Sequence, residues 1–322
     1  MKAITRFTNA IMERYLPDPY IFVAILTAIV VGLGVIFTDS SLVDMTVYWG
    51  DGFWGLLSFT MQMVIVLAAG HVLANSPLFK KALSGAASKI KTPTMAIIVV
   101  TFVSLIACWI NWGFGLVIGA LFAKEIARQV RKVDYRLLIA SAYSGFVIWH
   151  GGLAGSVPLS IATEGHPFQN IMGVVDTNIT LFSTYNLFIV LVILFTLPFF
   201  NRFLMPKDED VVEIDPSLIK DEEVELPKPE KNFASISERS YIITGVVGLL
   251  GITYIVYHFA TKGFKLDLNI INTIFIILGI ILHGTPQRFL AAVQQAIKTT
   301  GGIVFQFPFY AAIMSMMTLL GL

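Results

Sequence analysis

The sequence predicts an all-α polytopic membrane protein with inverted repeats, a re-entrant hairpin and a discontinuous transmembrane helix. Apolar residues make up 56% of the 322 positions and charged residues only 13%, about half the charged fraction of a soluble domain. The charged side chains are also segregated, because eight long stretches contain none. Each stretch is close to or above the roughly 20 residues that a helix needs to cross a bilayer. These stretches are residues 19–38, 52–79, 92–123, 137–163, 177–201, 240–261, 268–287 and 299–322.

The remaining composition argues against several other classes of protein. The 22 basic and 21 acidic residues nearly balance, so nothing indicates a nucleic-acid partner. The single cysteine, Cys108, can form neither an intrachain disulfide nor a cysteine metal cluster. The charge-free stretches contain no carboxylate pair, HExxH motif or Ser-His-Asp set. We therefore expect no enzyme activity and no cofactor.

The distribution of lysine and arginine predicts the orientation, because short cytoplasmic loops are enriched in these residues. Residues 1–14 carry three basic side chains, and residues 80–91 carry four lysines and no acidic residue. Residues 39–51 carry three aspartates and no basic residue. We therefore expect a cytoplasmic N-terminus, a first span that leads out and a second that returns.

Residues 92–123 have basic residues on both sides but are too few for two full spans of ~20 residues each. Their middle reads "CWINWGFGL". The economical interpretation is a re-entrant hairpin whose tip contains Asn111, Trp112 and Gly113. Irregular backbone at membrane depth is tolerated only where protein or a watery cavity satisfies it. The tip should therefore lie inside the protein.

Residues 137–163 would measure about 40 Å as one helix, against a hydrocarbon core of about 30 Å. The surplus length fits a span with an unwound stretch. Residues 150–158, which read "HGGLAGSVP", are the expected break, because they cluster glycines with a proline.

We expect three parts along the chain. Residues 1–201 form the first transmembrane repeat, with the re-entrant hairpin (92–123) and the broken helix (137–163). Residues 202–239, with 11 acidic and 6 basic side chains, form a cytoplasmic polar linker that we expect to be largely without fixed structure. Residues 240–322 begin a second, inverted repeat.

The repeat is suggested by two similar stretches. "GLLSFTMQMVIVLAAGHVLA" begins at Gly55 and "GGIVFQFPFYAAIMSMMTLLG" begins at Gly301, and the predicted spans run in opposite directions. Inverted repeats with broken helices are a common transporter plan. A complete second repeat would contain its own hairpin and broken span, so we expect a truncated chain of a protein roughly 120 residues longer.

The motifs "NWGFGL" (111–116), "HGGLAGSVPL" (150–159) and "YLPDPYIFV" (15–23) resemble the bacterial short-chain fatty acid transporter family, of the acetoacetate and butyrate uptake type. The resemblance implies that the protein belongs, with that family, to the wider ion-transporter superfamily of secondary carriers. The resemblance implies ion-coupled symport of small monocarboxylates, such as butyrate or acetoacetate, across the bacterial inner membrane. It also implies Na⁺ or H⁺ as the co-transported ion.

The two predicted breaks supply the candidate substrate-binding residues. A short fatty acid has one carboxylate, and no Lys or Arg lies within a charge-free stretch to pair with it. Helix N-termini, glycine backbone and side-chain donors can substitute. His150 is the titratable group that suits proton coupling, whereas unwound carbonyls could hold Na⁺. The candidates are Asn111, Trp112, Gly113, His150, Gly151, Gly152, Gly155 and Ser156.

Each candidate also has a structural interpretation. Asn111 could serve only as a cap, and the Ser156 hydroxyl could bond back to its own helix. His150 could be a neutral hydrogen-bond donor, and the glycines could serve close helix packing.

The leading prediction is a secondary active transporter of short-chain fatty acids. The alternatives are another organic-anion, dicarboxylate or Na⁺/H⁺ carrier of the same superfamily and, less favoured, a channel. The expected partners are the monocarboxylate and the lipid bilayer, and a homo-oligomer is left open.

Overall fold

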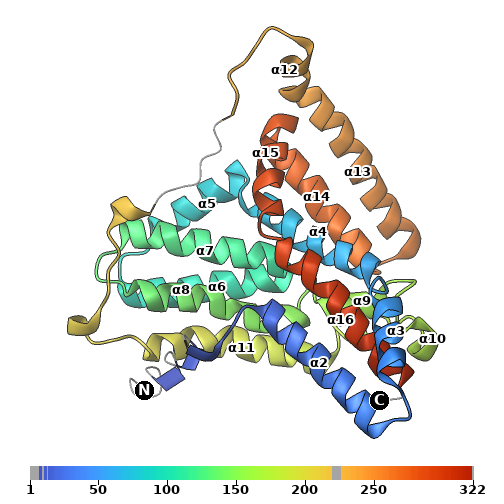
Figure 1. Ribbon diagram of the computed structural model, residues 1–322. Helices are drawn as coiled ribbons and strands as arrows, with labels where there is room; N and C mark the ends of the chain where they lie inside the picture. Colours follow the sequence, from blue (N-terminus) through green and yellow to red (C-terminus); the bar gives the residue numbers. More distant parts are fainter. Residues whose placement is uncertain (1–6, 9–10, 13, 220–225, 321–322) are drawn as a thin grey trace. The chain divides into compact units, whose positions relative to one another are not determined.

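The computed structural model describes residues 7–8, 11–12, 14–219 and 226–320 (Figure 1). In this part of the chain every regular element is a helix, and seven helices are long and apolar enough to cross a membrane. The prediction of an all-α polytopic membrane protein is confirmed. The seven are α2 (Pro19–Phe37), α4 (Leu57–Ala74), α6 (Pro93–Ile110), the interrupted helix Tyr135–Ala162, α11 (Thr184–Phe203), α13 (Tyr241–Lys262) and α16 (Gly301–Leu319).

The chain divides into two compact units. One comprises Met1–Val64 and Thr300–Leu322, and it holds α2, α3 (Leu42–Gly52), the start of α4, and α16. Its core includes the buried side chains of Met45 and Met316. Much of residues 1–14, on which the predicted orientation partly depends, lies outside the described residues.

The other unit, Ile65–Thr299, contains the predicted hairpin as two antiparallel helices, α6 and α7 (Trp112–Gln129), which lie side by side (Figure 1). Thr92 caps α6 by accepting a hydrogen bond from the backbone N–H of Met95, and Pro93 takes the first helical position. Each arm has 18 residues and measures about 27 Å. The arms are thus close to the thickness of the hydrocarbon, and α7 continues past the predicted end at residue 123.

The predicted broken helix is present, but its break is shorter than expected. It consists of α8 (Tyr135–Ser144), the 3₁₀ helix η1 (Gly145–Gly151) and α9 (Ser156–Ala162). Helical structure therefore continues through His150, and Pro158 lies in the first turn of α9, where proline is tolerated. Only residues 152–155 are non-helical. Our prediction of a break over 150–158 was wrong at both ends.

Several other helices surround these two elements. The buried side chains of Leu105, Ile148 and Val190 join α6, η1 and α11 in one cluster. Two amphipathic helices, α5 (Pro77–Ala87) and α15 (Pro286–Ile297), follow the apolar helices α4 and α14 (Leu268–His283), and each begins with proline. The remaining helices of the described residues are α10 (Gln169–Met172), α12 (Phe233–Glu238) and the short 3₁₀ helices η2 (Asp208–Asp210) and η3 (Pro216–Leu218).

Part of the polar linker is docked on the base of the hairpin. The buried carboxylate of Asp134 accepts a 2.9 Å hydrogen bond from the backbone N–H of Val212, and the backbone N–H of Tyr135 donates to the Val212 carbonyl oxygen, also at 2.9 Å. Further along, the Arg128 guanidinium donates to the carbonyl oxygen of Ile219 (2.9 Å). The expectation of a linker without fixed structure is therefore wrong for residues 205–219.

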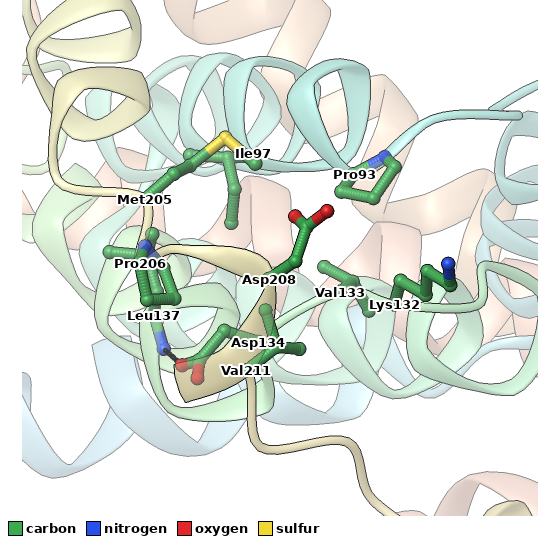
Figure 2. Close-up of a pocket in the computed structure, with 10 residues that line it drawn as sticks. All are labelled: Pro93, Ile97, Lys132, Val133, Asp134, Leu137, Met205, Pro206, Asp208 and Val211. Atoms are coloured by element: carbon green, nitrogen blue, oxygen red, sulfur yellow. Dashed lines mark hydrogen bonds between the residues drawn. The ribbon is translucent and has the colours of Figure 1, made fainter.

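Figure 2 shows this docking site, with a small cavity of about 110 Å³ between Pro93, Leu137, Met205 and Asp208. The Asp134 carboxylate in the same view also accepts a hydrogen bond from the backbone N–H of Leu137 (2.9 Å). Because Pro93 begins α6, this cavity lies one full helix length, about 27 Å, from the end of that arm. It belongs to the base of the hairpin and not to its tip.

Candidate functional site

The tip of the hairpin is Asn111, a fully buried residue with extended backbone (φ −157°, ψ 125°). Its backbone N–H donates to the carbonyl oxygen of Ala107 (2.9 Å) at the end of α6. Its Oδ1 accepts from the backbone N–H of Phe114 (2.9 Å) at the start of α7. Asn111 therefore caps the hairpin, as its structural interpretation supposed. Its amide nitrogen Nδ2 takes no part in the cap.

Glycines allow this tip to lie against the middle of α4. A Cβ atom at Gly113 would come 2.7 Å from the Cα of Leu67, and one at Gly70 would come 2.3 Å from the backbone nitrogen of Phe114. Both distances are far below van der Waals contact, so only glycine fits at either position. The irregular backbone of the tip is thus surrounded by protein, which is the condition for its survival within a membrane.

The second break is fastened by its own hydrogen bonds. The backbone N–H of Gly155 donates to the carbonyl oxygen of Gly152 (2.9 Å). From α11, the Asn186 amide donates to the carbonyl oxygens of Gly151 (3.1 Å) and Leu181 (2.7 Å). Among the described residues, the carbonyl oxygens of Gly151 and Gly152 therefore each accept one hydrogen bond, and a carbonyl oxygen has a second lone pair that can bind a ligand.

The two breaks are in direct contact. The backbone N–H of Leu153 donates to the carbonyl oxygen of Trp109, two residues before the tip, at 2.6 Å. Gly152 permits this approach, because a Cβ there would lie 2.3 Å from the same oxygen. The indole of Trp112 meets that of Trp149 edge to face, with ring centroids 5.6 Å apart. The structure thus brings together the two stretches from which all the candidate residues came.

Polar side chains behind the breaks connect the surrounding helices. The Ser104 hydroxyl on α6 donates to the carbonyl oxygen of Ala142 on α8. The Asn201 amide on α11 donates to Thr101 Oγ1 (3.1 Å) and to Ser144 Oγ (2.9 Å). These bonds join α6, α8 and α11 behind the candidate site.

Four buried polar atoms at the breaks lack a hydrogen-bond partner among the described residues. They are Trp109 Nε1, Asn111 Nδ2, Trp112 Nε1 and Ser156 Oγ. Most buried polar groups in proteins are paired, so each exception calls for an explanation such as a bound ligand. Three of the four are N–H groups, which only donate. Acceptor oxygens, such as those of a carboxylate, are the kind of ligand atom that N–H donors bind.

His150 stands apart from these buried atoms. Its side chain is exposed, and its ring lies beside that of Trp149, with centroids 3.9 Å apart. Its proton-carrying role stays a prediction.

The described residues contain no group of three His, Cys, Asp or Glu side chains that could hold a metal ion. A cation bound at the breaks would therefore rely on neutral oxygens from main-chain carbonyls, amides or hydroxyls. Unwound helices in transporters bind Na⁺ with such oxygens.

Comparison with known proteins identifies the family. The family model described as "Short chain fatty acid transporter" matches residues 1–322. The chain belongs to the short-chain fatty acid transporter family. The resemblance inferred from its motifs is confirmed. With seven helices in its described part that are long and apolar enough to cross a membrane, this family member is a multi-pass membrane protein.

Two relatives of this family member carry the name "Putative short-chain fatty acid transporter". The protein from Escherichia coli (strain K12) is 45% identical over 322 residues, and the protein from Haemophilus influenzae (strain ATCC 51907 / DSM 11121 / KW20 / Rd) is 44% identical over 328 residues. Both matches cover 99% of this chain and 73% of the relative. No solved structure matches the chain.

Sequence reasoning about this family member missed several residues of the site. Gly70 on α4, Trp109 beside the hairpin tip, Leu153 within the second break and Asn186 on α11 were not predicted as site residues. Asn186 had a detectable signal, because its amide lies between Tyr185 and Leu187 in a charge-free stretch. The others depend on contacts between distant segments.

Proposed function

We propose that the protein is a secondary active transporter that takes up short-chain monocarboxylates such as butyrate or acetoacetate. Membership of a transporter family and the buried pair of helix breaks support this proposal. The lysines of residues 80–91 support a cytoplasmic position for that loop and for the N-terminus, because the positive-inside rule favours basic residues in cytoplasmic loops. The membrane would be the bacterial inner membrane.

The observation that carries the proposal is the set of unpartnered donors at the breaks. Nε1 of Trp112 and Nδ2 of Asn111 sit at the tip of the hairpin. The first backbone N–H groups of α7 are also at this tip, and they are available as donors because the first N–H groups of a helix have no intrahelical acceptor. One of them, that of Phe114, is already capped by Asn111. A carboxylate has acceptor sites for the others, and the helix dipole favours its charge.

The apolar part of the ligand would meet aromatic rings. Trp112 packs against Phe146 and Trp149, with ring centroids 6.2 and 5.6 Å away. Such an aromatic wall suits a short acyl chain better than a second carboxylate. This preference favours a monocarboxylate over a dicarboxylate.

Burial of a bare carboxylate is costly unless the charge is paired. No lysine or arginine lies in the charge-free stretches, so a co-bound cation or proton would supply the compensation. We therefore propose symport with Na⁺ or H⁺. The Na⁺ would bind to neutral oxygens near the breaks, whereas the proton would be carried by the substrate or by His150.

Reconstitution in liposomes tests the proposal. We expect labelled butyrate to accumulate above its external concentration only when a Na⁺ or pH gradient is imposed, and collapse of the gradient should release it. Succinate in tenfold excess should compete poorly. Accumulation of succinate instead would favour a dicarboxylate carrier. A butyrate conductance without accumulation would favour a channel, and either result would refute the proposal.

A further inference from the structure

A cavity of about 730 Å³ opens beside the hairpin, between α4, α5, α7 and α15. Its inner end is lined by Leu67 and Leu116. Leu67 is the residue of α4 against which Gly113 of the hairpin tip packs. The cavity therefore begins next to the candidate site. Its size is within the ordinary range for small-molecule sites.

The lining residues recur at helical spacing along two helices. They are Leu67 and His71 on α4 and Asn75 directly after it, and on α7 they include Leu116, Ala120 and Lys124. Each set is spaced by four residues, so each forms one continuous face of its helix. Eight residues of helix span about 12 Å. The cavity is thus a passage of that length from Leu67 and Leu116, near the hairpin tip, to Lys124.

The mouth of this passage is positively charged. Lys80 of α5 and Lys124 of α7 both line it, and neither forms an ion pair within the described part of the chain. The acid Glu125 also lines the cavity, but its charge is paired with that of Arg128, with 2.5 Å between its Oε1 and the guanidinium nitrogen. The walls change from apolar near the tip to polar at His71 and Asn75 and then to cationic at the mouth.

We propose that this passage is an anion-selective vestibule that conducts short-chain carboxylates between the solvent and the hairpin tip, with Lys80 and Lys124 as the groups that attract them. The proposal rests on the proposed function, and it names the route by which substrate reaches the site. Two lysines at a cavity mouth raise the local concentration of anions. The apolar inner wall then receives the acyl chain. Neither lysine holds the substrate in its final position.

Equilibrium exchange of labelled butyrate in proteoliposomes tests the role of the lysines, because exchange samples access from both faces. We expect Lys80→Gln and Lys124→Gln each to raise the half-saturating butyrate concentration about threefold, with an unchanged maximal rate. Lys89→Gln, an exposed lysine outside the passage, is the matched control and should behave as wild type. Equal effects in all three variants, or wild-type behaviour in both passage variants, would overturn the proposal.

A thiol probe tests the passage without transport. Ala120 is exposed within it, and Cys108, the only cysteine of the sequence, is buried. In Ala120→Cys protein we expect an anionic methanethiosulfonate to react several-fold faster than a cationic one. This ratio should fall toward one when Lys80→Gln and Lys124→Gln are added, and at high salt. The modified protein should no longer exchange butyrate.

The proposal of a vestibule would be overturned if the reactivity ratio did not change when the two lysines were replaced, or if the modified protein exchanged butyrate at the full rate. If unmodified protein exchanges no butyrate, the proposed function fails. The reactivity ratio would still decide whether the cavity attracts anions. Liposomes of neutral lipid exclude a lipid phosphate as the anion at the lysines, and a lysine effect seen only with anionic lipid would assign the site to lipid headgroups and overturn the proposal.

Discussion

The backbone N–H of Leu153 and the carbonyl oxygen of Trp109 are 2.6 Å apart, and this hydrogen bond joins the broken helix to the hairpin. Trp109 lies in the last turn of α6, where carbonyl oxygens have no intrahelical donor. Leu153 lies in the non-helical stretch, where its N–H has no helical acceptor either. Each break therefore satisfies a group that the other leaves open.

This contact predicts a severe effect of Gly152→Ala. The new Cβ would lie 2.3 Å from the Trp109 oxygen, and a backbone atom has little freedom to move away. We expect a loss of roughly 1–3 kcal/mol of stability, as for other overpacked sites, and loss of butyrate exchange. Gly85→Ala is the control, because no atom lies within 4 Å of its Cβ and the residue is in a helix. Thermal unfolding in detergent that ranks the two variants equally would contradict the contact.

The capping and binding roles of Asn111 can be separated with Asn111→Ser. Serine is a good N-cap, so the acceptor for the Phe114 N–H is kept while the amide nitrogen is removed. We expect near-normal thermal stability and a roughly tenfold rise in the half-saturating butyrate concentration. Asn232→Ser, at the exposed cap of α12, should change neither. Unaltered butyrate exchange in Asn111→Ser would leave Asn111 as a cap only.

We expect Ser156→Ala to affect stability and transport in opposite directions. Removing a buried hydroxyl without a partner should leave stability unchanged or raise it slightly. If the hydroxyl binds substrate, butyrate uptake should fall several-fold. Ser141→Ala is a closely matched control, because Ser141 is likewise buried and unpartnered within the described structure but lies on α8, away from the breaks. Equal uptake in the two variants would argue against Ser156.

Trp112→Phe removes the indole N–H and keeps an aromatic ring. A hydrogen bond to a charged ligand contributes roughly 1.5–3 kcal/mol, so we expect butyrate affinity to fall by about ten- to a hundredfold. Neutral short-chain esters, if they bind, should be affected less. Trp54→Phe, at a position 65% exposed, should have no effect on affinity. Intrinsic fluorescence titration with butyrate measures both.

Linker docking should weaken at low pH. Burial by itself would raise the pKa of Asp134, but hydrogen bonds from Arg136 and from the backbone N–H groups of Val212 and Leu137 outweigh it, so the pKa lies below its ordinary value. The ordinary value is about 3.9. Because the folded pKa is depressed, this stabilisation is fully present above about pH 4 and is lost as the pH falls through the lower folded value.

Hydrogen exchange at the Val212 amide, corrected for its intrinsic pH dependence, measures this docking. In the wild-type protein, protection of this amide should decline below about pH 4. In Asp134→Asn, protection at pH 7 should already be roughly tenfold lower than in the wild type. Glu213→Gln, which changes an exposed acid of the same segment, should retain protection at pH 7. Protection of Val212 in Asp134→Asn equal to wild type would show that the carboxylate does not hold the linker.

The sequence was sufficient for the membrane class, the hairpin and the existence of a broken helix. These features follow from charge-free length and from glycine and proline clusters, which act locally. The predicted limits of the break were wrong for two reasons. Residues 145–151 form a 3₁₀ helix, and Pro158 lies in the first turn of α9, where proline is tolerated. A pattern of residue types does not distinguish 3₁₀ helix from unwound chain.

Contacts between distant segments could not be predicted. Nothing in the sequence places Gly70 opposite Phe114, or Val212 opposite Asp134. Docking of the polar linker followed from backbone pairing, which composition does not reveal. The inverted repeat stays a prediction. In the structure, α4–α6 and α14–α16 share one order: an apolar helix, an amphipathic helix that begins with proline, and an apolar helix. This order aligns α4 with α14, whereas the similar stretches that begin at Gly55 and Gly301 align α4 with α16.

The bonds of Ser104, Asn201 and Leu153 limit how this part of the protein can move. A movement of α6 away from its neighbours would break its hydrogen bonds to α8, to α11 and to the second break at the same time. The loss of each hydrogen bond costs about 1 kcal/mol of free energy, in addition to the lost packing. A displacement of all four elements as one rigid body breaks none of these bonds. Solute access that alternates between the two faces is therefore easier by bodily translation or rotation of this assembly than by opening the hairpin as a flap.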